Sequence, residues 1–296
     1  CFRSQPFDCI VAVGGGSPID TAKGIRIVAA NGGSVGDYAG VNRVPAASPV
    51  PLVAIPTTSG TGSEVTMFGV YSDWQNQVKV TVTSMAMAPS LAVVDPDLTM
   101  NLPAKMTAAS GIDALAHGIE TYFSQRANPA SDALAVQAMK LVVENLRTAV
   151  QNGSDSTARA GMSKGSLLAG MAFNSGFLGL AHAIGSALSG HCHVPHGVAI
   201  GLLLPRVVAF NTPANPQKAE TIGKLLAGRG RETGSAADEL FRLVEEIGLP
   251  TRLRDVGVPV EKLPEIAEDS FKSGMMKFNP RQPTVEEVVE LLQAAY

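Results

Sequence analysis

A run of three glycines, Gly14 to Gly16, constrains the fold of this chain more than any other feature. Residues 8–13 before it form a short apolar segment that predicts a strand, and residues 18–30 after it have the pattern of a helix. Residues 51–55 and 92–94 predict two further strands. Strands that alternate with helices predict an α/β fold with a mostly parallel sheet.

The segment after the glycines has the residues of a helix N-terminus. Ser17 is a suitable N-cap, Pro18 suits the first helical position, and Asp20 completes a capping box. A strand, a glycine turn and a helix start together favour an anion site, because backbone N–H groups can approach phosphate oxygens there. The spacing is not GxGxxG, so the standard Rossmann fingerprint does not apply. A glycine-rich turn without a ligand stays open as the alternative.

A second loop rich in glycine and threonine, Pro56–Thr66, follows the second predicted strand. Its hydroxyls and backbone amides could hydrogen-bond phosphate and ribose. Both loops stand at the carboxyl ends of strands, where open α/β sheets bind ligands. Lys79 offers a cation to the same ligand, although a solvated surface lysine is the ordinary reading of that residue.

From residue 104 onward the sequence predicts helices only. Apolar residues recur at helical spacing between residues 134 and 150, and residues 158–172 are rich in Ala, Gly and Met, which permits close helix contacts. Two later helix starts carry N-cap pairs: Ser235 with Asp238, and Thr284 with Glu287. A domain boundary is therefore expected near residues 103–105.

The five histidines of the chain point to a metal site. Asp113 and His117 are four residues apart in a strong helix pattern, so both side chains project from one face. The other four histidines lie in one short stretch: His182, His191, His193 and His196. Three imidazoles and one carboxylate form a mixed N/O site, which suits Fe(II) or Zn(II) better than Mg or Ca. A helix-surface pair at Asp113 and His117 is the alternative, and the clustering of the histidines disfavours it. For His191 and His193 we expect pocket-lining or surface positions rather than ligation.

Composition excludes several other classes of protein. The net charge is −3 with scattered Lys and Arg, so neither a nucleic-acid-binding face nor a polybasic membrane segment is expected. Three cysteines at irregular spacing argue against a disulfide framework and fit a reducing cytoplasm. The most apolar run, Val198–Phe210, is too short to span a bilayer, and no signal peptide is recognised. The chain starts at Cys1, almost directly at a strand, and further chain is expected upstream of it.

Taken together, these motifs resemble the iron-containing, or group III, alcohol dehydrogenases. The resemblance rests on Gly14–Asp20, Pro56–Thr66, Gly111–Glu120, His182 with Pro195–Gly197, and Asn279–Arg281. It covers essentially the whole chain in the right order. It implies a dehydroquinate-synthase-like architecture, with an α/β dinucleotide-binding domain over residues 1–103, its N-terminal part missing, and an all-helical metal domain over residues 104–296.

The resemblance also implies the ligands and the residues that hold them. One divalent metal, Fe(II) or Zn(II), is expected on Asp113, His117, His182 and His196. NAD or NADP is expected on Gly15, Gly16, Ser17, Asp20, Thr57, Thr58, Thr61, Thr66 and Lys79. The implied partner is a small alcohol, aldehyde or hydroxy acid, and the implied assembly is a cytoplasmic homodimer.

One departure from the family concerns proton transfer. Several members have a histidine four residues after the third metal ligand, where this chain has Ser186. The proton could pass instead through Ser186, a cofactor ribose hydroxyl, water, His191 or His193, so no catalytic residue is assigned. The upstream residues that would choose between NAD and NADP are not in this sequence.

The expected activity is hydride exchange between an alcohol carbon and a nicotinamide, with the metal as Lewis acid. A dehydroquinate-synthase-like lyase is the nearest alternative. Its substrates require a cluster of Lys and Arg near the metal, and the segments around Asp113 and His182 contain few basic residues. A second alternative is an inert metal-binding or interaction module with an incomplete nucleotide domain.

Overall fold

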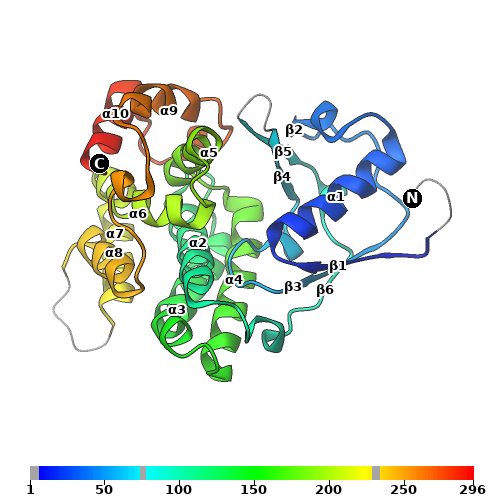
Figure 1. The fold of residues 1–296 in the computed structure, drawn as a ribbon, viewed down its shortest axis with the longest axis horizontal. Coiled ribbons are helices and arrows are strands. Elements are labelled where there is room, and N and C mark those ends of the chain that lie inside the picture. The colour runs from blue at the N-terminus through cyan, green and yellow to red at the C-terminus, as the bar shows by residue number, and fades with distance from the viewer. Residues whose placement is uncertain (1–6, 74–77, 229–233) are drawn as a thin grey trace.

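The computed structural model describes residues 7–73, 78–228 and 234–296. Within these residues all strands lie before residue 93, and the long elements after residue 103 are helices. Figure 1 shows the strands and helix α1 (Gly16–Asn31) on one side of the molecule, with the other helices packed together on the opposite side. The predicted fold class, an α/β part followed by a helical part, is confirmed.

The first sheet consists of the three predicted strands, in the order β1-β3-β6. These are β1 (Ile10–Gly14), β3 (Leu52–Pro56) and β6 (Leu91–Ala92). All pairings are parallel, and Gly14 stands opposite Pro56, so the glycine turn and the threonine loop leave the sheet side by side. Helix α1 covers one face, where Ile19 packs against Leu52 and Ala54.

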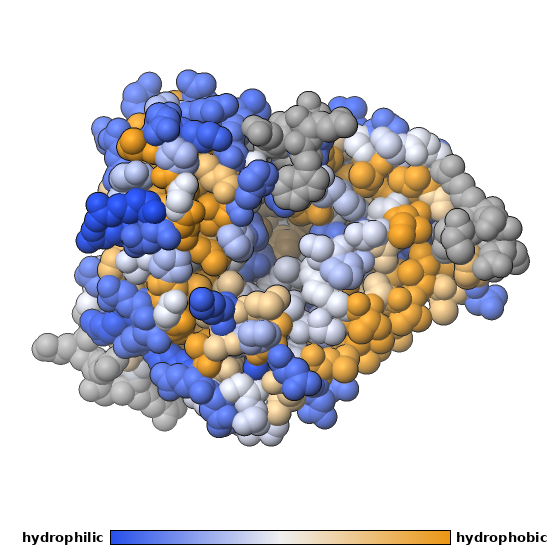
Figure 2. Space-filling model, in the orientation of Figure 1, coloured by the Kyte–Doolittle hydropathy of each residue, from blue (hydrophilic) through white to orange (hydrophobic). Residues whose placement is uncertain are grey.

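The opposite face of this sheet is apolar and exposed. Val11, Val13, Leu91 and Val93 are between 41% and 56% exposed. Figure 2 shows apolar residues gathered at the lower right, over the place that β1, β3 and β6 occupy in Figure 1. Parallel sheets are usually covered on both faces, so this surface is unusual for a parallel sheet.

A second sheet was not predicted. It contains β2 (Gly40–Val41), β5 (Val78–Thr83) and β4 (Phe68–Asp73), in the order β2-β5-β4. β4 and β5 form an antiparallel pair, whereas β2 joins β5 in parallel. This sheet packs on α1 and faces α5 across a pocket.

The helical half is built around α2 (Ala104–Phe123). The other helices are α3 (Pro129–Gln151), α4 (Ser156–Gly176), α5 (Leu180–Cys192), α6 (His196–Asn211), α7 (Pro216–Ala227), α8 (Ala236–Glu246), α9 (Leu263–Ser270) and α10 (Val285–Ala294). α2 contacts α3, α4 and α6, and its apolar side chains lie in one large core. Small residues bring the helices close, as expected: a Cβ at Gly165 would lie 2.8 Å from Val142.

One stretch of the described helices, His196–Ala214, is long and apolar enough to cross a membrane, with a mean hydropathy of 1.3. It is longer than the apolar run in the sequence suggested, because a 3-10 turn, Thr212–Ala214, continues α6. About 56% of it is buried, and Ile200, Leu203 and Val207 belong to the helical core. In this fold the stretch therefore packs as a core helix.

The helix starts follow the predicted caps with one exception. The hydroxyls of Ser235 and Thr284 cap α8 and α10 as predicted. The prediction that Ser17 caps α1 is wrong: Gly15 is the N-cap, the helix begins at Gly16, and Ser17 lies within the first turn. A glycine cap has no side-chain acceptor, so the first backbone N–H groups of α1 have no side-chain cap.

Candidate metal and cofactor site

Four predicted ligands converge from three helices. Asp113 and His117 project from one face of α2, His182 lies on α5, and His196 is the first residue of α6. The Asp113 Oδ1 atom is 3.3 Å from His182 Nε2, 3.7 Å from His196 Nε2 and 3.8 Å from His117 Nε2. Three imidazole nitrogens therefore face a single carboxylate oxygen.

These atoms are suited to a cation. Asp113 Oδ1 and His182 Nε2 are buried and have no hydrogen-bond partner among the described residues. Leaving such atoms unpaired costs free energy, and a shared ion would satisfy both. The ligand atoms of Asp113, His182 and His196 all lie within 4.8 Å of one another. A set of imidazole nitrogens and a carboxylate suits Fe(II) or Zn(II).

A second layer of groups orients the histidine rings. The Glu120 carboxylate lies 2.5 Å from His182 Nδ1 and accepts a hydrogen bond from the Ala181 backbone N–H. His117 Nδ1 lies 3.2 Å from the Gly60 carbonyl oxygen. With Nδ1 engaged in this way, each ring presents Nε2 to the common centre. Glu120 was not among the predicted site residues, although Asp113, His117 and Glu120 are spaced i, i+4 and i+7 along one helix face.

The charges around the centre favour ligation. Burial opposes ionisation of Asp113, but the surrounding imidazoles hold its pKa well below the usual value. Burial lowers the pKa of His117 to about 4, so this ring is a neutral donor at physiological pH. Burial also acts to lower the pKa of His182, yet the Glu120 and Asp113 carboxylates raise it to about 9. Coordination through His182 Nε2 would therefore require this ring to lose its proton.

The two predicted cofactor loops contact each other beside the start of α1. The Thr57 backbone N–H donates to the Gly14 carbonyl at 2.9 Å. A Cβ at Gly15 would lie 3.3 Å from Thr58 Oγ1, and one at Gly16 would lie 2.8 Å from Thr61 Cγ2. A side chain at position 16 would displace Thr61, and one at position 15 would be tightly packed against Thr58, so glycine permits this close approach. The helix start keeps uncapped N–H groups, which suits a phosphate.

The remaining predicted cofactor residues differ in their surroundings. Ser17 is exposed beside the glycine turn. The Asp20 carboxylate accepts hydrogen bonds from Ser63 Oγ and Val70 N–H, and Thr66 is buried behind the loop. Lys79 Nζ donates to Ser72 Oγ at 2.7 Å and lines the pocket described next.

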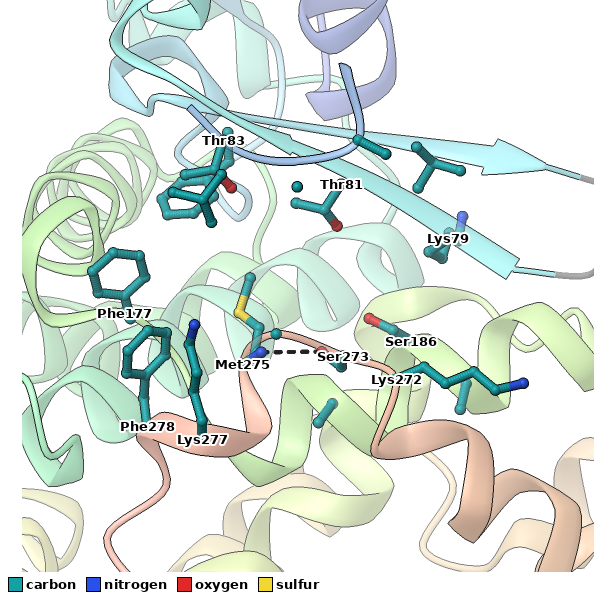
Figure 3. Close-up of a pocket in the computed structure, with 18 of the residues that line it drawn as sticks. Lys79, Thr81, Thr83, Phe177, Ser186, Lys272, Ser273, Met275, Lys277 and Phe278 are labelled. Atoms are coloured by element: carbon teal, nitrogen blue, oxygen red, sulfur yellow. Dashed lines mark hydrogen bonds between the residues drawn. The ribbon is translucent and has the colours of Figure 1, made fainter. Parts of the chain in front are cut away.

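A pocket of about 360 Å³ opens between β5 and α5. Figure 3 shows Lys79, Thr81 and Thr83 on the strand side, facing Phe177 at the end of α4 and a later segment that carries Met275, Lys277 and Phe278. Figure 2 shows the surface hollowed where the strands meet the helical half. The aromatic end adjoins the metal centre, because Phe68 of the pocket packs on Phe173, whose ring centroid is 4.7 Å from that of His117.

The three weak candidates for proton transfer occupy different places. Ser186 and His191 both line the pocket on α5. His191 is buried and its Nε2 lies 2.9 Å from Asp269 Oδ2. His193 is an exposed residue at the C-cap of α5, with a left-handed backbone φ of 55°.

Comparisons with known proteins match this arrangement over nearly the whole chain. Residues 1–96 match the family model of iron-containing alcohol dehydrogenase, and residues 107–296 match that of the Fe-containing alcohol dehydrogenase family, C-terminal. The chain is 43% identical over 301 residues to a 1,3-propanediol dehydrogenase of Citrobacter freundii, covering 100% of this chain and 78% of that protein. It is 41% identical over 300 residues to an NAD-dependent methanol dehydrogenase of Bacillus methanolicus, covering 99% and 78%.

Solved structures agree. A 1,3-propanediol oxidoreductase superposes with a TM-score of 0.94 at 43% identity, over 100% of this chain and 78% of that one. A sulfoacetaldehyde reductase from Bifidobacterium kashiwanohense, solved with NAD⁺, gives a TM-score of 0.86 at 31% identity, over 99% and 77%.

Proposed function

The chain belongs to the iron-containing alcohol dehydrogenase family, and we propose that the four side chains converging from α2, α5 and α6 hold its divalent metal. These are Asp113, His117, His182 and His196. As a member of this family the protein is a metal-dependent alcohol dehydrogenase that uses NAD. The convergence of three Nε2 atoms on one otherwise unpaired carboxylate oxygen supports the residue assignment.

When bound, the ion supplies a Lewis acid for the alcohol oxygen and the nicotinamide supplies the hydride chemistry. The chain supplies the positions. Glu120 and Gly60 hold two of the rings, and the side chains of Asp113, His117 and His182 are only 5–6% exposed, which excludes water from that side. The His196 side chain is 38% exposed, so the approach of an alcohol is expected along this side.

The substrate we infer is a small alcohol, aldehyde or hydroxy acid. Relatives named for 1,3-propanediol and methanol support this class. The pocket supports it too, because aromatic side chains stand at the end near the metal centre and Lys79 and Lys272 stand farther along. Ser186 lies one helical turn after His182 and lines this pocket, which supports it over the exposed His193 as a proton-transfer group.

We further infer two domains: residues 1–103 bind the dinucleotide, and residues 104–296 bind the metal. The loops at the ends of β1 and β3, and the start of α2 at Ala104, support that division. A cytoplasmic homodimer remains our proposal for the assembly. The thiols of Cys9 and Cys192 are unpaired, which is consistent with a reducing compartment, and Cys1 lies outside the described residues.

A substrate panel with NADH and NADPH, run on protein reconstituted with Fe(II) or Zn(II), tests the function. We expect steady cofactor oxidation with small aldehydes. In the His196→Ala variant both metal retention and turnover should be lost, whereas His193→Ala, a change at an exposed histidine three residues away, should retain the metal. Wild-type turnover by the His196→Ala variant after chelation would contradict the assignment.

A further inference from the structure

Lys23 lies inside the nucleotide-binding half without reaching any surface. It stands about two turns into α1 and is 0% exposed. Its Nζ lies 2.6 Å from the Phe68 carbonyl oxygen, 2.8 Å from Ser63 Oγ, and 3.3 Å from both Thr66 Oγ1 and Asp20 Oδ1. An ammonium group has three donors, so all of them have acceptors within reach.

This group of residues, here called the Lys23 cluster, joins the two elements that form the proposed phosphate site. Lys23 and Asp20 belong to α1, whose first turn contains Gly16. Ser63 belongs to the threonine loop, and its backbone N–H donates to Thr61 Oγ1 at 3.2 Å. Thr61 in turn packs against Gly16. A chain of direct contacts therefore runs from the buried ammonium to both loops of the proposed phosphate site.

The same cluster reaches the wall of the substrate pocket. Phe68, whose carbonyl accepts from Lys23, is the first residue of β4 and lines the pocket. Asp20 also binds β4, because its Oδ2 accepts a hydrogen bond from the Val70 backbone N–H at 2.9 Å. One side chain thus fixes α1 relative to the loop before β4 and to β4 itself.

Burying an ammonium group is costly, and replacing a buried ion pair by apolar residues of similar volume is often neutral or stabilising. Burial lowers the pKa of Lys23, because removal from water disfavours the charged ammonium group. Lys23 nevertheless donates to acceptors on α1, the threonine loop and β4. Its role is therefore better explained by the positioning of these three elements than by a gain in the free energy of folding.

We propose that Lys23 is a positioning residue for the dinucleotide, which fixes the threonine loop against the glycine turn, and that Asp20 acts through Lys23 and Ser63 rather than by touching the cofactor. This rests on the proposed function, in that the two loops are taken to hold NAD. Both Asp20 oxygens already accept hydrogen bonds within the protein, from Ser63 Oγ and the Val70 N–H, which supports an indirect role for this carboxylate.

The experiment measures NADH binding by fluorescence on the metal-loaded protein, without turnover. Lys23→Met removes the charge and keeps the length of the side chain. We expect the dissociation constant for NADH to rise about tenfold or more, because buried acceptors lose their donor and the loops shift. Metal content should stay at the wild-type level. Lys140→Met, a change at an exposed lysine on α3, is the matched control and should bind NADH as the wild type does.

A double-mutant cycle with Asp20→Asn tests the joint role. If Asp20 acts through Lys23, the double variant should bind NADH about as weakly as Lys23→Met alone, and additive losses would overturn that part. Unchanged NADH binding in Lys23→Met, even with a lowered melting temperature, would overturn the positioning role. If Lys23→Met does not fold, Ser63→Ala and Thr66→Val each remove one acceptor, and wild-type NADH binding in both would overturn it equally. Failure of the wild type itself to bind NADH would instead refute the proposed function and, with it, this inference.

Discussion

Among single residues, Glu120 supports the proposed metal centre without being one of its predicted ligands. Its carboxylate accepts from the backbone N–H of Ala181 at 2.5 Å and meets the His182 ring at 2.5 Å. It is only 3% exposed, so both interactions are shielded from water. One side chain on α2 therefore fixes both the start of α5 and the direction of a ligand ring that α5 carries.

We predict that Glu120→Gln weakens metal binding by about 10–100-fold while the fold is retained. The amide keeps the shape of the side chain but loses the charge that makes the His182 ring a strong donor. Competition with a chromophoric chelator gives the dissociation constant. Glu144→Gln, at an exposed position of α3, is the control. Equal metal affinity in wild type and Glu120→Gln would show that the carboxylate does not support the ligand.

Among elements, the contact between α2 and α6 decides where His196 stands. Gly197 follows the ligand directly, and a Cβ there would lie 2.6 Å from the backbone carbonyl carbon of Ala109. Real Cβ atoms do not approach backbone so closely, so only glycine lets the start of α6 lie this near to α2. The distance between His196 and Asp113 depends on this approach.

Gly197→Ala should therefore weaken metal binding although all four ligands remain. The added methyl group moves the start of α6 away from Asp113, and the expected loss of affinity is about tenfold or more, because a misplacement of about 1 Å is costly at such a centre. Metal content after dialysis measures it. Gly274→Ala adds a methyl group in open space and should retain the metal. Full retention by Gly197→Ala would mean that α6 can shift without consequence.

The elements also show how far sequence alone leads. The helical half was predictable, because periodic apolar residues and caps such as Ser235 and Thr284 act locally. The hairpin of β4 and β5 was missed, although Val78-Lys79-Val80-Thr81-Val82-Thr83 alternates with the period of a strand. Its partner β4 opens with Phe68 and Gly69, both buried, so alternation is weak there.

Single-site prediction has the same limit. Asp113 and His117 could be placed together because their spacing along one helix is a local signal, whereas His182 was joined to them through the clustering of the few histidines and the family resemblance. The Lys23 cluster could not, because its members are 40 to 45 residues apart and meet only through packing. The Ser17 cap failed because glycine at position 15 allows the helix to begin earlier than the best capping side chain suggests.

At the scale of the whole molecule, the metal centre joins helices that are separate in sequence. α2, α5 and α6 each contribute at least one ligand. Removing the ion should therefore lower the melting temperature of the helical half, since binding to the folded state alone stabilises it by about 4 kcal/mol when the free ion is about a thousandfold above its dissociation constant. Calorimetry with and without chelator measures this. In His196→Ala the chelator should cause little shift, and an equal shift there would place the stabilising ion elsewhere.

The exposed apolar face of the first sheet should promote self-association of this polypeptide in solution. Val11 and Val13 lie on β1, which is an edge strand of that sheet among the described residues. The exposed apolar face is therefore next to an unpaired strand edge. An environment-sensitive dye such as anilinonaphthalene sulfonate should brighten on it, and light scattering should rise with protein concentration. The double substitution Val11→Lys and Val13→Lys should suppress both the dye fluorescence and the light scattering, and metal content should stay unchanged.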